Sequence, residues 1–126
     1  MIRTDGTTRL VWCVGSIAIK IARGRLGARC NRFEAAFYRD SGPEMQAKLC
    51  PPLWCSDNGA VLVMPRAQPI SEDEFDSLLN GGLIPFFDRD DEEDSPFEWG
   101  KASDWGRLDG RIVALDYSAN VALGRA

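Results

Sequence analysis

The chemistry open to this chain is limited first by a residue type that it lacks. The sequence contains no histidine, so Ser-His-Asp and Cys-His catalysis and histidine-ligated metal sites are excluded. Any chemistry must therefore rest on carboxylates, lysine, thiols or a bound hard cation. Among the carboxylates, Asp116 is distinctive because it directly follows residues 112–115, an apolar run typical of a strand. An acid in that place holds a metal or a positive side chain, or is a polar residue where the strand meets water.

Lysine and the thiols are the other candidates for chemistry. Lys20 is flanked by apolar residues on both sides, which favours partial burial and a specific partner. The alternative is a lysine on the solvent face, with its stem lying over neighbouring side chains. The four cysteines lack the paired C-x-x-C spacing of a structural zinc site. In a cytoplasmic protein such cysteines are more often buried thiols.

Strand pairs joined by tight turns are the main structural signal in the sequence. Residues 9–14 and 17–22 are strand-like and flank Gly15-Ser16, a dipeptide that suits a two-residue hairpin turn. In the second of these strands, three isoleucines alternate with alanine and lysine, so one face is large and apolar and the other is small except for Lys20. Two more strand pairs carry turn signals of the same kind: residues 52–56 and 60–64 around Asn-Gly, and residues 104–108 and 111–116 around Asp-Gly.

Two helices are predicted between the hairpins. The main helix is expected to begin at Asn31, a good N-cap residue, with Glu34 completing a capping box, and residues 24–29 read as a loop. A short second helix begins after Ser71, with Glu74 in the same relation to its cap. Because hairpins dominate and no parallel crossover repeats, the predicted fold is α+β, with a mainly antiparallel sheet, one main packed helix and a short second helix.

Length and charge bound the class of protein. With 126 residues, 44% of them hydrophobic, the chain is expected to form one domain with a core of its own. No apolar run approaches the ~18 residues of a membrane-spanning helix, and the first ten residues resemble no signal peptide. We therefore expect a cytoplasmic protein with no membrane partner. The formal net charge of -4 fits nucleic-acid binding poorly, since such proteins usually carry a basic surface.

The acidic run between positions 88 and 94 is the most biased segment of the chain. Carboxylates spaced along a surface can imitate phosphates and occupy a basic groove on another protein, and aromatic residues beside them suit an interface. The alternatives are a solvated loop for the acids and core packing for the aromatics. The candidate partner-binding residues are Asp88, Asp90, Asp91, Glu92, Glu93, Asp94, Phe97 and Trp99.

Four segments, in this order, resemble the protein-kinase-like superfamily, including small kinases of the aminoglycoside phosphotransferase type. "IAIK" looks like the V-A-I-K motif of the third kinase strand, with Lys20 in the place of its lysine. "NRFEAAFYR" looks like the helix that follows, and "VLVMPRA" like the strand that enters the hinge between the lobes. "DWGRLDGRIVALDYS" looks like the catalytic-loop hairpin that ends in the metal-binding D-F-G motif. The resemblance implies a kinase N-lobe plus hinge and catalytic-loop hairpin, in one reduced domain over residues 1–126.

The resemblance also implies roles for particular residues. Lys20 would contact nucleotide phosphate, and Glu34 would pair with Lys20 and orient it; the alternative for Glu34 is to cap its own helix. Asp116 stands for the D-F-G aspartate and Asp104 stands where a kinase has its metal-binding asparagine, so both would hold Mg²⁺ beside ATP. The alternatives are a turn for Asp104 and, for Asp116, an ion pair with Lys20 or hydrogen bonds from backbone N–H groups of the next turn.

The sequence departs from the kinase pattern where catalysis would take place. No G-x-G-x-x-G loop precedes "IAIK", the H-R-D motif is absent, and Trp99, with Glu98 beside it, takes the place of the catalytic aspartate. The leading hypothesis is therefore a small acidic protein with a reduced, pseudokinase-like fold that binds a partner protein, as a phage or mobile-element inhibitor binds a host protein. The alternatives are a minimal ATP- and Mg²⁺-dependent phosphotransferase and a plain structural domain.

Overall fold

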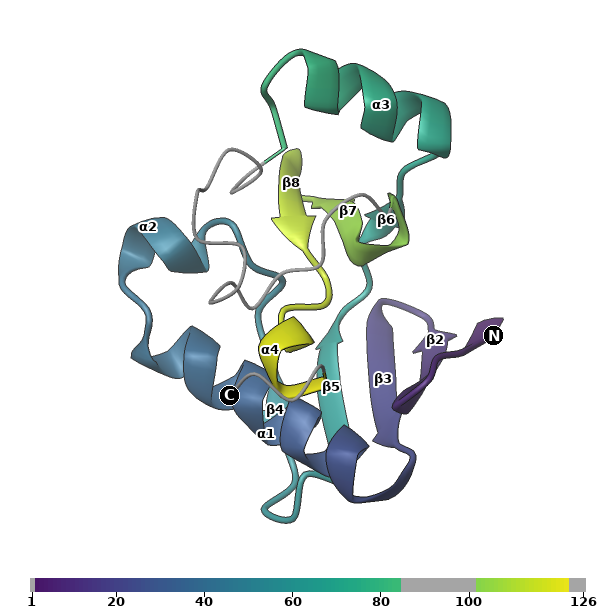
Figure 1. Ribbon diagram of the computed structural model, residues 1–126, viewed down its shortest axis with the longest axis vertical. Coiled ribbons are helices and arrows are strands. Elements are labelled where there is room, and N and C mark those ends of the chain that lie inside the picture. The colour runs from purple at the N-terminus through teal and green to yellow at the C-terminus, as the bar shows by residue number, and fades with distance from the viewer. Residues whose placement is uncertain (1, 85–101, 123–126) are drawn as a thin grey trace.

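The computed structural model describes residues 2–84 and 102–122, drawn as the coloured ribbon in Figure 1. Strands and helices are mixed along the chain, as the α+β prediction requires. The strands are β1 Ile2–Asp5, β2 Arg9–Val14, β3 Ile17–Ala22, β4 Trp54–Cys55, β5 Val61–Pro65, β6 Gln68–Pro69, β7 Trp105–Leu108 and β8 Arg111–Ala114. The helices are α1 Gly24–Asp40, α2 Pro43–Gln46, α3 Glu72–Asn80 and α4 Ala119–Ala122, with a short 3-10 helix, η2, at Ala102–Asp104.

The strands form two antiparallel sheets, which confirms the predicted fold class. The larger sheet has the order β1-β2-β3-β5-β4 and the smaller one the order β6-β7-β8. All three predicted hairpins are present, as β2–β3, β4–β5 and β7–β8. β1 is an additional strand that the sequence does not predict, because Ile2 is its one large apolar residue. It forms instead by pairing along its whole length with β2.

The main helix α1 begins at Gly24, so the predicted loop over residues 24–29 and the predicted N-cap at Asn31 are wrong. Asn31 lies inside the helix and is fully buried. Its side-chain amide donates to the backbone carbonyls of Lys20 on β3 and Gly59 in the β4–β5 turn, at 3.2 and 2.8 Å. The Asn31 side chain would suit a helix cap, but here its hydrogen bonds join α1 to the sheet. Tertiary contacts override the local preference of this residue.

Two glycines let the first half of α1 lie close to neighbouring turns. A Cβ atom at Gly27 would lie 2.1 Å from the backbone oxygen of Thr8, in the turn between β1 and β2. A Cβ atom at Gly59 would lie 2.2 Å from the backbone oxygen of Ala28, and Gly59 also has a positive φ of 77°. Both approaches exclude a side chain at the glycine, so the helix is held between the two turns of the sheet.

The two faces of the larger sheet differ in composition and in cover. α1 packs against β3, β4 and β5 on one face, here named the inner face, to which Lys20 and Leu62 belong (Figure 1). The opposite, outer face carries Ile17, Ile19 and Ile21 of β3, each of them half-buried. The large apolar side of β3 is thus turned away from α1, and the small side with its lysine is turned toward it.

The hydrophobic core lies between the inner face, α1 and the β7–β8 hairpin. The hairpin is tied to the segment after α2, because Cys50 N–H donates to the carbonyl of Ala114 and Ala114 N–H donates to that of Lys48, each at 2.9 Å. The hydroxyl of Tyr117 donates to the carbonyl of Cys50 at 2.8 Å. These bonds place the residues that follow β8 against α1. The largest apolar members of the core are Leu49, Leu62, Met64, Phe75, Trp105, Val113 and Tyr117.

The short helix α3 is confirmed together with its cap. The hydroxyl oxygen of Ser71 accepts a hydrogen bond from the backbone N–H of Glu74 at 3.1 Å, and Phe75 is buried in the core.

None of the helices in the described ranges has both the length and the apolar character needed to cross a membrane.

Candidate functional site

A cluster of polar residues, all buried except Asp116, lies where β2, β3, α1 and the segment after β8 meet. Its members are hydrogen-bonded or ion-paired to one another although they are far apart in the sequence. They are Arg9, Lys20, Asn31, Glu34, Asp116 and Ser118, and we call them the charged cluster. The sequence analysis assigned Lys20 to phosphate binding and Asp104 and Asp116 to metal binding. Lys20 and Asp116 both belong to this cluster, where Glu34 and Arg9 connect them.

Glu34 is the centre of the cluster and has no exposed surface. Its carboxylate accepts hydrogen bonds from both terminal nitrogens of Arg9 (2.5 and 3.2 Å), from Lys20 Nζ (2.9 Å) and from the backbone N–H of Tyr117 (2.8 Å). Burial would raise the pKa of Glu34, but the positive charges of Arg9 and Lys20 and their hydrogen bonds outweigh it and lower the pKa to about 2. Glu34 is therefore ionised throughout the physiological range.

Lys20 forms the predicted ion pair with Glu34, and the alternative of a lysine on the solvent face is wrong. Lys20 is only 6% exposed. Besides Glu34, its ammonium group donates to the backbone carbonyl of Leu115 at 2.5 Å. The alternative that Glu34 caps its own helix is also wrong, because α1 begins ten residues before it, at Gly24. Lys20 thus links β3, α1 and the end of the β7–β8 hairpin.

Arg9 is the member of the cluster that sequence reasoning missed. It is buried, and its guanidinium contacts Asp116 at 3.2 Å, Asn31 Oδ1 at 3.0 Å and Ser118 Oγ at 3.3 Å in addition to Glu34. Burial would lower the pKa of Arg9, but the negative charges of Glu34 and Asp116 raise it well above its usual value. The alternation of side chains along a strand could have identified it. Arg9 lies two residues before Val11, and Val11 pairs with Lys20, so Arg9 and Lys20 share the inner face.

Asp116 forms an ion pair with a basic side chain and accepts hydrogen bonds from the next turn, the two alternatives to a metal ligand. It pairs with a positive side chain, which is Arg9 rather than Lys20. It also accepts hydrogen bonds from the backbone N–H and the hydroxyl of Ser118, each at 3.3 Å. Its side chain is 38% exposed, in contrast to the rest of the cluster. The carboxylate therefore reaches the surface while its inward side is bound by the guanidinium.

Asp104, the second predicted metal ligand, lies at the same end of the hairpin as Asp116. It ends η2 and is largely buried, and its carbonyl accepts a hydrogen bond from Leu115 N–H at 2.8 Å. Over residues 2–84 and 102–122, no group of three or more acids and cysteines is placed to hold a metal ion. A metal-binding role for Asp104 and Asp116 stays a prediction.

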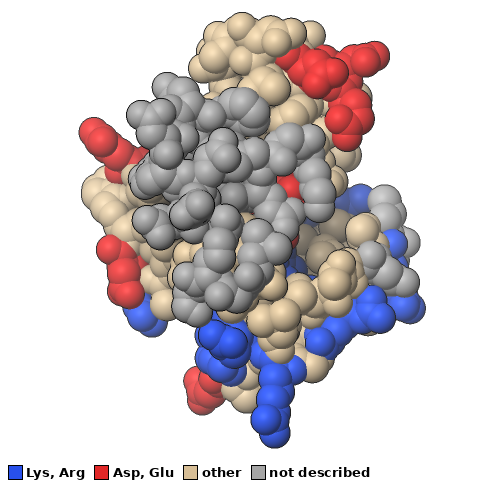
Figure 2. Space-filling view, in the orientation of Figure 1, with Lys and Arg blue, Asp and Glu red and all other residues tan. Residues whose placement is uncertain are grey.

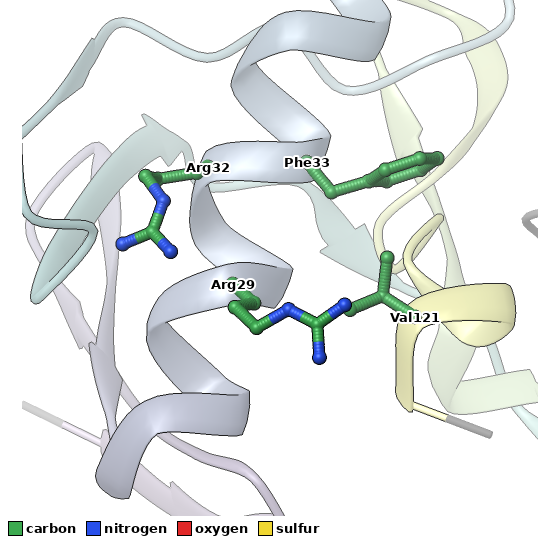
Figure 3. Close-up of a pocket in the computed structure, with 4 residues that line it drawn as sticks. All are labelled: Arg29, Arg32, Phe33 and Val121. Atoms are coloured by element: carbon green, nitrogen blue, oxygen red, sulfur yellow. The ribbon is translucent and has the colours of Figure 1, made fainter. Parts of the chain in front are cut away.

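An open pocket of about 370 Å³ lies on the other side of α1, between that helix and α4. Figure 3 shows Arg29 and Phe33 reaching from α1 toward Val121 of α4, whereas Arg32 points to the opposite side of the helix. Arg32 donates to the backbone carbonyl of Asn58 at 2.7 Å. The pocket is basic and partly aromatic, so it suits an anionic group better than a cation.

Surface charge is unevenly distributed over the molecule. In the view of Figure 2, basic side chains gather at the lower end, where α1 begins, and acidic side chains gather over α3. The basic residues there are the exposed Arg23, Arg25, Arg29 and Arg32, and the exposed acids of α3 are Glu72, Asp73 and Asp76. The predicted partner-binding residues from Asp88 to Asp94, with Phe97 and Trp99, lie outside the described residues.

Comparison of the chain with models of protein families, with curated proteins and with solved structures gives no match.

Proposed function

We propose that this protein has a reduced kinase-like fold and acts by binding a partner protein rather than by turning over a nucleotide. The kinase-like part of the proposal is supported by Lys20 on β3 and Glu34 on the following helix, which pair as the strand lysine and helix glutamate of protein kinases do. The non-catalytic part is supported by a single observation, which is that the charged cluster already satisfies its own charges.

The charges of the cluster balance within the protein. Arg9 and Lys20 carry two positive charges, and Glu34 and Asp116 carry two negative charges. A phosphate that recruited Lys20 would compete with Glu34 and with the carbonyl of Leu115. A magnesium ion at Asp116 would lie beside the guanidinium that already occupies the inward side of this carboxylate. Each ligand would therefore have to compete with a charged or polar partner that the protein already supplies, which weakens its binding.

A minimal ATP- and Mg²⁺-dependent phosphotransferase is the second candidate function. It is favoured by the same Lys20–Glu34 pair and by the position of Asp104 and Asp116 at one end of the hairpin. In that case Lys20 would contact phosphate, and the partly exposed carboxylate of Asp116 would hold the metal together with Asp104.

Thermal unfolding with ATP and Mg²⁺ separates the two functions. A ligand at ~100 times its dissociation constant would stabilise the fold by about 2.7 kcal/mol, a shift of several degrees for this size. We expect no shift for the wild-type protein. A shift that Asp116→Asn removes and Asp109→Asn retains would establish the phosphotransferase. Asp109 is a suitable control because it is an exposed acid in the turn of the same hairpin, with a positive φ that asparagine tolerates.

Partner binding is tested by affinity capture with the intact chain as bait. The matched bait carries Asn or Gln in place of the six acids between positions 88 and 94. We expect one partner to be captured by the wild-type chain and lost by the neutralised chain, because the acids would imitate phosphate in a basic groove. Equal capture by both baits would show that the acidic run is not the binding segment, and no specific capture would contradict the proposed function.

A further inference from the structure

The outer face of the larger sheet is apolar across four neighbouring strands. The strand register places ten residues on it, every one of them apolar. They are Leu10, Trp12 and Val14 of β2, Ile17, Ile19 and Ile21 of β3, Val61, Val63 and Pro65 of β5, and Trp54 of β4. On the edge strand β1, the charged Arg3 lies opposite Trp12 in this register.

No helix of the described chain covers this face. α1 packs on the inner face, and none of the other described helices makes an extensive contact with the larger sheet. The ten apolar residues are accordingly half-buried or exposed, with Trp54 at 57% and Val14 at 41% exposed. A sheet usually turns its charged side to water and its apolar side to the core. Here the side with the buried arginine and lysine is inside, so the apolar side is left to be covered by something else.

The size of the face is that of a small, reversible interface. The 19 residues of β2, β3, β5 and β4, at ~3.3 Å per residue and ~4.8 Å between strands, outline roughly 300 Å² of flat sheet. Two such faces in contact would bury at least about 600 Å² in total, which is at the low end of protein–protein interfaces and fits a dimer that dissociates on dilution. The largest apolar patch on an ordinary monomer is about 300–600 Å² and is itself often functional.

We propose that a second copy of this chain covers the outer face, in a two-fold symmetric dimer that packs sheet on sheet. A uniformly apolar, gently twisted face is complementary to itself, and sheets stack in this way about 10 Å apart. The ten residues of the face on β2, β3, β5 and β4 carry no charge that would select a differently charged partner. The guanidinium of Arg3, 5.4 Å from the centre of the Trp12 ring, lies at the edge strand, where an interface has its polar rim. This dimer does not rest on the proposed partner or on the acidic run.

Sedimentation velocity over a series of concentrations tests the dimer. We expect the wild-type chain at ~100 µM to sediment with twice its mass of 14.0 kDa and to dissociate on dilution. Ile19→Lys, at the centre of the face, should weaken association at least about tenfold, because it places a charge in the apolar contact. Leu26→Lys is the matched control. Leu26 lies on α1, away from the face, and is 37% exposed, so this substitution adds the same charge outside the proposed contact.

Three outcomes would overturn the proposal. They are a wild-type chain that stays monomeric at ~100 µM, a dimer that survives Ile19→Lys, and a dimer that Leu26→Lys disrupts equally. Trp54→Lys provides a second variant in case Ile19→Lys does not fold, because Trp54 is on the same face and mostly exposed. A monomeric wild-type chain would assign the face to a different protein, and a dimer lost in Trp54→Lys but not in Leu26→Lys would support the proposed contact.

Discussion

The inner and outer faces of the larger sheet show that apolar character alone does not decide which side of a sheet is buried. The inner face carries Arg9 and Lys20, which are buried, whereas the outer face carries three isoleucines of β3, which are only partly buried. The two faces differ in what the rest of the chain packs against them. The helix that covers the inner face brings Glu34, which binds both basic residues, while the outer face finds no cover among the described elements.

The largest expected effect comes from neutralising the acid that allows the inner face to be buried. Glu34→Gln leaves Arg9 and Lys20 buried with only part of their compensation, so we expect a loss of about 3–5 kcal/mol in the free energy of unfolding. Urea denaturation measures it. The matched control is Glu74→Gln, because Glu74 pairs with Arg107 at 3.2 Å near the surface, and such pairs contribute less than about 1 kcal/mol. Equal losses in the two variants would contradict the central role of Glu34.

Acid should loosen the inner face in a defined pH range. The native pKa of Glu34 is about 2, below its usual value of 4.5, so the unfolded chain binds the proton first as pH falls. Stability from this group is complete above pH 4.5 and is lost as pH falls through about 2, a total of roughly 3 kcal/mol. Carbon NMR of the Glu34 carboxyl group measures the native pKa directly. A midpoint near 4.5 in the folded protein would disprove this account of the cluster.

Truncating two neighbouring residues of β5 to alanine compares how much each face contributes to stability. Leu62 points to the inner face and has no exposed surface, whereas Val63 points to the outer face and is half-buried. Leu62→Ala should cost about 2–3 kcal/mol of unfolding free energy through the cavity it leaves. Val63→Ala should cost about 1 kcal/mol in the monomer, measured by urea denaturation at low protein concentration. A larger loss at Val63 would mean that the outer face is covered within a single chain.

The contrast between the faces also marks the limit of what the sequence predicts. Hairpins are encoded locally by turn residues such as Gly15 and Gly59, and the cap of α3 by Ser71, so these features are predictable and are confirmed. The start of α1 is set by close approach to distant turns, and the burial of Arg9 is set by Glu34, 25 residues away. Such long-range causes leave little trace in a local pattern, which is why the ion pair of Lys20 could be anticipated through a resemblance while the second base could not.

The smallest expected effect is on the outer face itself. Ile19→Thr keeps the β-branched shape that suits a strand and replaces one methyl-bearing branch with a hydroxyl at a half-buried position. In the monomer at low concentration, we expect a change of at most about 1 kcal/mol in the free energy of unfolding, measured by urea denaturation. At high concentration the same variant should dissociate more readily than the wild-type chain, because a hydroxyl would be desolvated in the contact. Loss of monomer stability without a change in association would place the isoleucine in an internal core and remove the distinction between the two faces.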